Sequence, residues 1–207
     1  MYNHVTQEKC SFCLEKKQHI QNFRYLCNDC FQLLRPAKLK TNCLVSLYEY
    51  TAELRYILLQ AKTCGDKFAI SCLVELVSKN IYTQLLLEQA DFIMPAPSSL
   101  WSRLRGKTDF TWFLVRALAQ KNNLERLYPQ RSFYWNWNKR SKLERSGYYP
   151  LESFHSPSKR YTVLLVDDVI TTGHTLHMVG RSISAYYRIL YLTLANSRNY
   201  LKGDKKR

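Results

Sequence analysis

One stretch, residues 163–175, constrains the fold of this 207-residue chain more than any other. It opens with the apolar run Val-Leu-Leu-Val, which is long enough for a buried strand and too short for a typical helix. Threonines and a glycine follow where a helix is expected to begin. Backbone N–H groups at a helix N-terminus, nearby hydroxyls and a glycine that permits close approach form a cradle for an anion such as phosphate.

Two adjacent carboxylates, Asp167 and Asp168, stand between the strand and the cradle. Carboxylates repel phosphate, so they suit a group attached to it, such as vicinal sugar hydroxyls or a divalent cation. The combination predicts a site for a ribose 5-phosphate, with an ordinary strand and capped helix as the alternative. The expected phosphate contacts are Thr171, Thr172, Gly173, His174 and Thr175.

Four cysteines near the start form two matching pairs, Cys10-x-x-Cys13 and Cys27-x-x-Cys30. Each pair can place two thiolates on one turn, and the two turns can close a tetrahedral site around Zn²⁺. Four sulfur ligands leave no position open for water, so a structural zinc is expected, whereas a redox dithiol would need only one pair. Residues 1–10 lack the apolar core of a signal peptide, so we expect these cysteines to bind metal and not to form disulfides.

Charge is the least ordinary part of the composition, because 31 Lys and Arg against 16 Asp and Glu give a formal net charge of +15. Such an excess favours polyanionic partners, above all nucleic acid, although a basic surface can also serve solubility alone. No apolar run approaches the ~20 residues that span a bilayer. A cytoplasmic protein without a membrane span is therefore expected.

Aromatic and cationic residues alternate in the hood segment, which we define as residues 127–158. This pattern suits stacking on single-stranded nucleic acid, while simple packing of the aromatics on the domain is an equal alternative. The candidate contacts are Arg131, Trp135, Trp137, Lys139 and Arg140.

A second phosphate-handling region is expected near the loop Met94-Pro95-Ala96-Pro97, where a short strand ends. Ligands of open α/β sheets gather at the carboxyl ends of strands. Hydroxyls and cations follow this loop, which suits pyrophosphate, although a plain turn and a solvated helix would look the same. The pyrophosphate candidates are Lys62, Pro97, Ser98, Arg103 and Arg105.

The remaining pattern predicts a series of strands and helices. Residues 43–50 and 187–195 are expected as strands. Asp66 is placed to cap a helix through Lys79, directly after a helix that Gly65 should stop. Further helices are expected at 109–120, with Phe113 on the inner face, and at 175–186.

Taken together, these motifs resemble a known family. Residues 163–175 resemble the signature with which type I phosphoribosyltransferases bind 5-phosphoribosyl 1-diphosphate (PRPP). The resemblance extends to the ComF (ComFC, GntX) family through the cysteine pairs, Tyr56 to Lys67, Met94 to Pro97 and Arg105-Gly106. One departure is Lys107-Thr108-Asp109, which replaces the family's usual Phe-Asn-Gln.

The resemblance implies an α/β fold of the type I phosphoribosyltransferase kind, a mostly parallel sheet flanked by helices, with a small N-terminal Cys₄ zinc ribbon. Residues 1–40 would form the ribbon and linker, and 41–207 the main domain. It further implies a cytoplasmic competence protein that acts on incoming single-stranded DNA in natural transformation, binds PRPP with Mg²⁺ and works beside a partner such as the competence helicase.

Two functions stay open at this level. As an enzyme, the chain would transfer ribose 5-phosphate from PRPP to an acceptor, with Asp167 and Asp168 orienting the ribose and cations neutralising pyrophosphate. As a binding protein, it would engage PRPP or DNA without turnover, which the charge and the hood segment favour.

Overall fold

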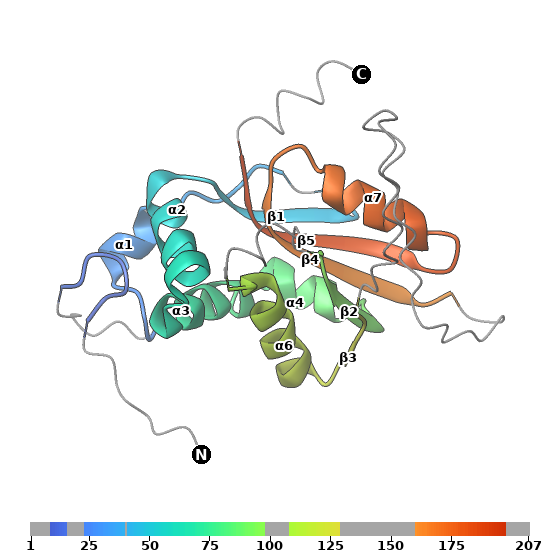
Figure 1. Ribbon diagram of the computed structural model, residues 1–207, viewed down its shortest axis with the longest axis horizontal. Coiled ribbons are helices and arrows are strands. Elements are labelled where there is room, and N and C mark those ends of the chain that lie inside the picture. The colour runs from blue at the N-terminus through green and yellow to red at the C-terminus, as the bar shows by residue number, and fades with distance from the viewer. Residues whose placement is uncertain (1–8, 16–22, 40, 98–107, 129–159, 198–207) are drawn as a thin grey trace, which may run out of the picture.

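The computed structural model of the protein describes residues 9–15, 23–39, 41–97, 108–128 and 160–197 (Figure 1). Within them lies a five-stranded sheet in which every strand pair is parallel. This confirms the expected mostly parallel sheet. Its spatial order is β1 (Leu44–Glu49), β5 (Arg188–Asn196), β4 (Thr162–Ile170), β2 (Phe92–Pro95) and β3 (Glu125–Arg126).

Helices cover both faces of the sheet, which is why β4 is an almost continuous apolar run. Leu164 and Val166 of β4 belong to one apolar cluster, shared with the helices that precede β4 in the chain. Val163 and Leu165 belong to a second cluster, which α7 closes. The helical elements are α1 (Asn28–Gln32), α2 (Ala52–Leu59), the π-helix η1 (Gln60–Cys64), α3 (Lys67–Ser78), α4 (Ile81–Leu87), α6 (Phe110–Asn122) and α7 (His174–Ile183).

Local signals place most helix boundaries as expected. Gly65 ends η1 in the left-handed region, with φ +61°, where a side chain would be strained. Asp66 caps α3, since its carboxylate accepts the Phe68 N–H at 2.9 Å. The expectation that Phe113 lies on the inner face of α6 is wrong: its side chain is exposed, and the buried face instead passes through Leu114 and Leu118.

The cysteine-containing region packs directly on α2 and α3. Leu26 and Leu34 join the same apolar cluster as those helices. The Phe12 and Tyr56 rings meet edge to face with centroids 6.0 Å apart, and the Arg24 N–H donates to Glu75 Oε2 at 2.8 Å. The region therefore shares a core with the sheet domain.

The linker after this region, residues 35–39, runs antiparallel to β1. Its hydrogen bonds pass from the Ala37 N–H to the Leu47 carbonyl at 2.9 Å and from the Glu49 N–H to the Arg35 carbonyl at 2.8 Å. The linker is thus tied to the sheet by backbone bonds along its length.

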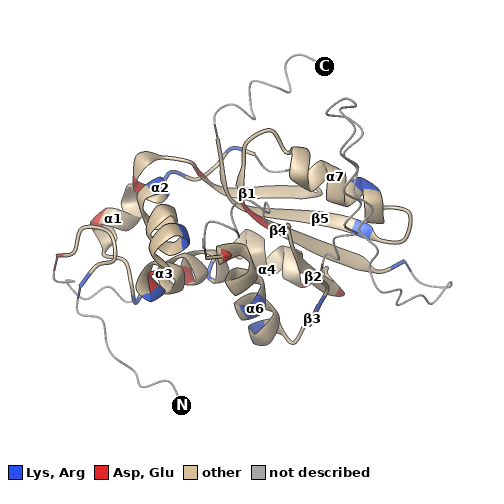
Figure 2. Cartoon of the chain, in the orientation of Figure 1, with Lys and Arg blue, Asp and Glu red and all other residues tan. Residues whose placement is uncertain are grey.

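Charge is distributed unevenly between the described residues and the rest of the chain. Figure 2 shows Lys and Arg interspersed with Asp and Glu over the described elements. These residues hold 14 of the 31 cationic side chains and 12 of the 16 acidic ones, so their net charge is +2 and the other segments carry +13. The hood segment beyond Tyr128, with all five nucleic-acid candidates, lies outside the described residues.

No helix in the described parts of the chain is both long and apolar enough to cross a membrane.

Candidate functional site

The carboxyl ends of β2 and β4 bring the expected site together. Pro95 pairs with Val166, and the Ala96 N–H donates to the Val166 carbonyl at 2.7 Å. The proline loop, including Pro97, therefore leaves the sheet beside Asp167 and Asp168. This is the edge at which ligands of parallel α/β sheets bind.

Asp168 is buried and is paired with a cation from another layer. Only 8% of the residue is exposed, and its Oδ2 forms an ion pair with Lys62 Nζ of η1. Its other oxygen, Oδ1, accepts the Val169 N–H at 2.6 Å. Burial of a carboxylate is tolerated because both oxygens face a positive group or a donor.

Asp167 is less well compensated than its neighbour. Its Oδ1 accepts the Asp168 N–H at 2.8 Å. Burial raises the pKa of Asp167 to about 7, against the lowering effect of the Lys62 charge and with a further rise from the carboxylate of Asp109. Asp109 caps α6 by accepting the Trp112 N–H at 3.2 Å, so a helix-capping residue also acts on the electrostatics of the site.

Two buried hydroxyls stand in register with Asp167. Thr193 of β5 is its partner across the sheet, and Ser46 of β1 is the partner of Thr193. Both residues are fully buried, and neither hydroxyl has a hydrogen-bond partner among the described residues. Sequence reasoning missed this row because the two positions look like ordinary small polar residues within apolar strands.

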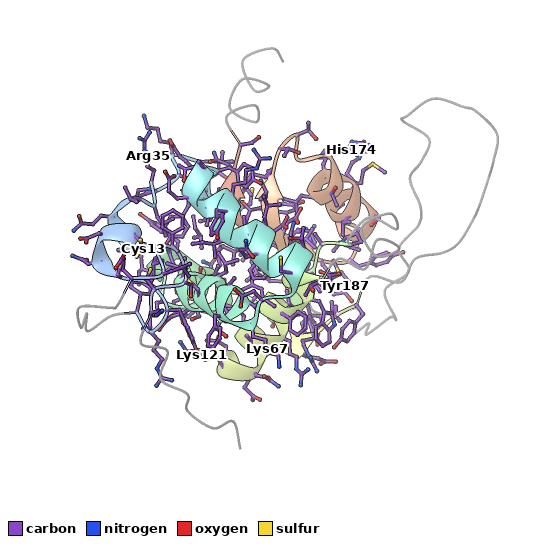
Figure 3. The ribbon with its side chains drawn as sticks, turned by 60° about the vertical axis from the view of Figure 1, so that its left-hand side comes forward. Cys13, Arg35, Lys67, Lys121, His174 and Tyr187 are labelled. Atoms are coloured by element: carbon purple, nitrogen blue, oxygen red, sulfur yellow. The ribbon has the colours of Figure 1, made fainter. Side chains whose placement is uncertain are left out.

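The turn from β4 into α7 has the form of an anion cradle. Gly173 precedes the helix with φ +70°, and the His177 N–H makes the first helical bond, to the Gly173 carbonyl, at 2.8 Å. Thr171, Thr172 and Thr175 are exposed there, and Figure 3 shows His174 at the start of α7. The His174 N–H already donates to Thr172 Oγ1 at 3.4 Å, whereas the other hydroxyls and N–H groups of this first turn can reach a ligand from solvent.

Helix α7 packs closely on β5 where Gly180 meets the side chain of Tyr191. A methyl group in place of the Gly180 hydrogen would collide with the hydroxyl of Tyr191. The Tyr191 hydroxyl therefore occupies the space that a side chain at position 180 would need.

The pyrophosphate candidates divide into two groups. Lys62 and Pro97 lie beside the acid pair, whereas Ser98, Arg103 and Arg105 fall outside the described residues. One contact was not anticipated: the Thr108 N–H donates to the Lys62 carbonyl at 2.9 Å. The segment that leads into α6 therefore lies against the backbone of Lys62.

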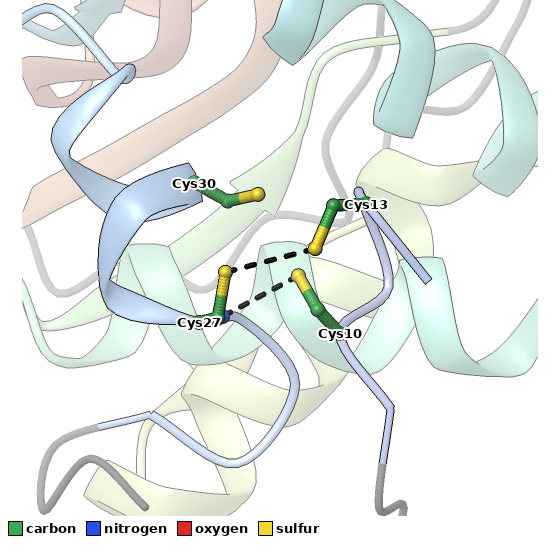
Figure 4. A group of neighbouring side chains, drawn as sticks. All are labelled: Cys10, Cys13, Cys27 and Cys30. Atoms are coloured by element: carbon green, nitrogen blue, oxygen red, sulfur yellow. Dashed lines mark hydrogen bonds between the residues drawn. The ribbon is translucent and has the colours of Figure 1, made fainter. Parts of the chain in front are cut away.

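The four predicted cysteines converge on one point (Figure 4). The Sγ atoms of Cys10, Cys13, Cys27 and Cys30 all lie within 4.8 Å of one another, and those of Cys13 and Cys27 are 3.8 Å apart. Sulfur ligands of a tetrahedral zinc are about 3.8 Å apart for bonds of about 2.3 Å. The cluster could hold a metal such as zinc with little movement.

Backbone donors already favour thiolate at one of these positions. Burial acts to raise the pKa of Cys10, but N–H groups that include those of Phe12 and Cys27, each 3.4 Å from its Sγ, outweigh it and lower the pKa to about 7. Burial and the neighbouring thiols raise the pKa of Cys30. Four close thiols in this state are suited to a shared cation that removes their protons.

No protein-family model and no curated protein matches the sequence. Matches are found among solved structures. Orotate phosphoribosyltransferase from Aeropyrum pernix matches at 16% identity over 64% of this chain and 62% of its own, with a TM-score of 0.44. The chain thus spans less than two thirds of that enzyme.

Adenine phosphoribosyltransferases give similar values. The enzyme from Rhodothermus marinus matches at 12% identity over 86% of this chain and 89% of its own, with a TM-score of 0.43. That from Trypanosoma brucei, solved with AMP, pyrophosphate and ribose-5-phosphate, matches at 15% identity over 86% and 69%, with a TM-score of 0.40.

Proposed function

We propose that the carboxyl end of β4 and the start of α7 bind PRPP. The observation that carries this proposal is the pairing of two adjacent carboxylates, Asp168 buried and Asp167 half-buried, with a glycine-opened helix start on one sheet edge. Asp167 and Asp168 accept hydrogen bonds from the two ribose hydroxyls. The 171–175 turn donates to the 5-phosphate through amides and hydroxyls.

The pyrophosphate half of the ligand is assigned to the β2 side of the site. Lys62 lies beside the acid pair and supplies positive charge, and the loop through Pro97 forms the wall of that side. Arg103 and Arg105 are further candidates from the sequence. Mg²⁺ bound with PRPP would neutralise part of the pyrophosphate charge. The metal of the cysteine cluster is taken to be zinc in a structural role, since all four ligands are thiols.

The cellular role that fits best is that of a bacterial cytoplasmic competence protein, which acts on incoming single-stranded DNA and works beside a helicase. The ComF-like motifs support this role, and so does the charge. The segments other than the described residues carry 17 of the 31 Lys and Arg. Two of these segments, 98–107 and 198–207, begin directly after Pro97 and Ser197, which follow β2 and β5. Cationic chain is thus attached at the edge where PRPP would bind.

Phosphoribosyl transfer is the second candidate function. The observation in its favour is Lys62, a cation suited to the leaving pyrophosphate, next to the acid pair that would orient the ribose. An assay for pyrophosphate release from PRPP in the presence of single-stranded DNA or nucleobases separates turnover from binding.

The PRPP site is tested by Asp167→Ala combined with Asp168→Ala. We expect loss of PRPP–Mg²⁺ binding of roughly 100-fold or more by calorimetry, because two charge-assisted hydrogen bonds are removed. Glu88→Ala, an exposed carboxylate at the end of α4, is the matched control and should leave the affinity unchanged. Unchanged PRPP affinity in a folded double variant would sink the site assignment.

The DNA role is tested by Trp135→Ala combined with Trp137→Ala. Fluorescence anisotropy with labelled single-stranded DNA should show a loss of affinity of about 10-fold or more, since each stacked base contributes about 1–3 kcal/mol. Phe113→Ala, which removes an exposed aromatic from α6, is the control. Equal DNA affinity in both variants would favour a packing role for the hood aromatics.

A further inference from the structure

We propose that Lys62 is a resident counter-ion of Asp168, and that PRPP binds by exchange: the ribose hydroxyls take over Asp168 while Lys62 Nζ moves to the pyrophosphate. This inference rests on the proposed function of the site. It assigns Lys62 two successive partners, where the sequence suggested only pyrophosphate.

The need for a resident cation follows from the crowding of negative charge. Asp168 is buried, Asp167 lies next to it in the chain, and the charge of Asp109 is close enough to raise the pKa of Asp167. A buried carboxylate left without a compensating charge is strongly unfavourable. The Lys62 ion pair therefore stabilises the site while no ligand is present.

The same ion pair must be opened before Asp168 can serve a sugar. Oδ1 of Asp168 is held by the Val169 N–H, and Oδ2 is the oxygen that faces Lys62. The Oδ2 atom itself is buried, so we expect a ribose hydroxyl to reach it only by taking the place of the ammonium group. Displacement of the ammonium group is favourable when a second anion lies close by. PRPP carries such an anion, its pyrophosphate, on the ribose carbon next to those that carry the hydroxyls.

Only the side chain of Lys62 needs to move in this exchange. Its carbonyl accepts the Thr108 N–H at 2.9 Å, and a Cβ on Gly65 would already lie 3.1 Å from Thr108 Oγ1. The backbone of η1 is therefore held against the start of α6. The lysine side chain, by contrast, is 34% exposed and flexible, so its ammonium group can turn from one anion to another.

The exchange of Lys62 predicts a result that is not expected if Lys62 only attracts anionic ligands. Ribose 5-phosphate offers hydroxyls but no pyrophosphate, so it must break the ion pair without giving Lys62 a new partner. In Lys62→Met, ribose 5-phosphate should bind about 3- to 10-fold more tightly, while PRPP–Mg²⁺ should bind about 10- to 100-fold more weakly. Lys67→Met, at the exposed start of α3, is the control and should shift neither ligand (Figure 3).

Calorimetric titration of both variants with both ligands decides the matter. Opposite shifts support exchange; two losses, or no change, overturn it. A wild-type measurement covers the case in which Lys62→Met does not fold: pyrophosphate with Mg²⁺ should tighten ribose 5-phosphate binding about 3- to 10-fold, because it draws Lys62 away from Asp168. Absence of this coupling overturns the proposal. Wild-type protein that binds neither PRPP nor ribose 5-phosphate would instead remove the proposed function, and the exchange with it.

Discussion

The cysteine cluster and the β4–α7 site both bring several acidic groups close together, but their charges are compensated in different ways. The cluster brings four identical donors within 4.8 Å, from two turns that are close in the sequence. The β4–α7 site combines Asp167 and Asp168 with Lys62 of η1 and with Asp109, the cap of α6, which are distant in the sequence. The first arrangement suits a permanent metal ion, and the second an exchangeable protein cation.

This difference teaches where stability and function are separated in the molecule. A metal bound by four thiolates would stabilise the fold and would offer no open coordination position to a substrate. The acid pair weakens the fold, since burying carboxylates is unfavourable, and in return presents acceptors to a ligand. Removal of a cysteine ligand should therefore lower the stability of the protein, whereas neutralisation of an acid of the pair should raise it.

Removal of one metal ligand is expected to have the largest effect. Cys30→Ser should lower the free energy of unfolding by about 4 kcal/mol, the stabilisation that a metal gives at about 1,000 times its dissociation constant. Thermal unfolding with elemental analysis measures this, and one zinc per chain is expected in the wild type. Cys43→Ser, an exposed cysteine outside the cluster, is the control. A wild-type protein that is folded without metal would remove the contrast between the two regions.

A smaller effect, of opposite sign, is expected from Asp167→Asn. The native pKa of Asp167 is about 7, whereas an unfolded aspartate titrates near 4, so the native state retains a proton that the unfolded chain has lost. The stability contributed by this proton is present below about pH 4 and is lost as pH rises through about 7. Wild type should therefore lose on the order of 2 kcal/mol relative to Asp167→Asn between about pH 5 and pH 8.

Urea unfolding of both proteins without ligand checks this prediction. The stability difference between the two proteins is the informative quantity, because any loss of metal from the cysteine cluster at low pH would affect both equally. If the free energies of unfolding of the two proteins change with pH in parallel, the charge of Asp167 is as well compensated as that of Asp168, and the prediction is wrong.

Gly173→Ala should have the smallest effect on stability and a selective one on binding. An alanine at φ +70° costs about 1–2 kcal/mol, which is expected to distort the turn before α7. PRPP affinity should fall about 10-fold in calorimetric titration. Ser182→Ala, later in the same helix, is the control for a general weakening of α7. An equal loss in both variants would indicate that the turn has no particular role in phosphate binding.

Sequence reasoning succeeded where the physics is local. The left-handed Gly65, the Asp66 cap, the β4 strand and the convergence of the cysteine pairs all depend on residues near one another in the chain. The motif positions were therefore predictable from nearby residues, whereas the parallel α/β architecture was expected from the family resemblance of residues 163–175.

What could not be predicted depends on tertiary contacts. The Lys62–Asp168 ion pair joins residues in different layers, and no local pattern specifies it. Helix α4 spans only seven residues after the Asn80 cap, too few for a clear periodicity. Phe113 was misplaced because an apolar residue at helical spacing looks like core, whereas its ring lies exposed beside Trp112.

The antiparallel pairing of residues 35–39 with β1 has a consequence for the whole protein. β1 is the last strand on its side of the sheet, and an uncovered last strand is a template for pairing with another chain. This covering segment begins five residues after Cys30. If loss of the metal disorders the cysteine region, we expect the disorder to extend into this segment. Chelation should therefore promote aggregation through the sheet, and the metal would help to keep the protein monodisperse without contacting its ligand.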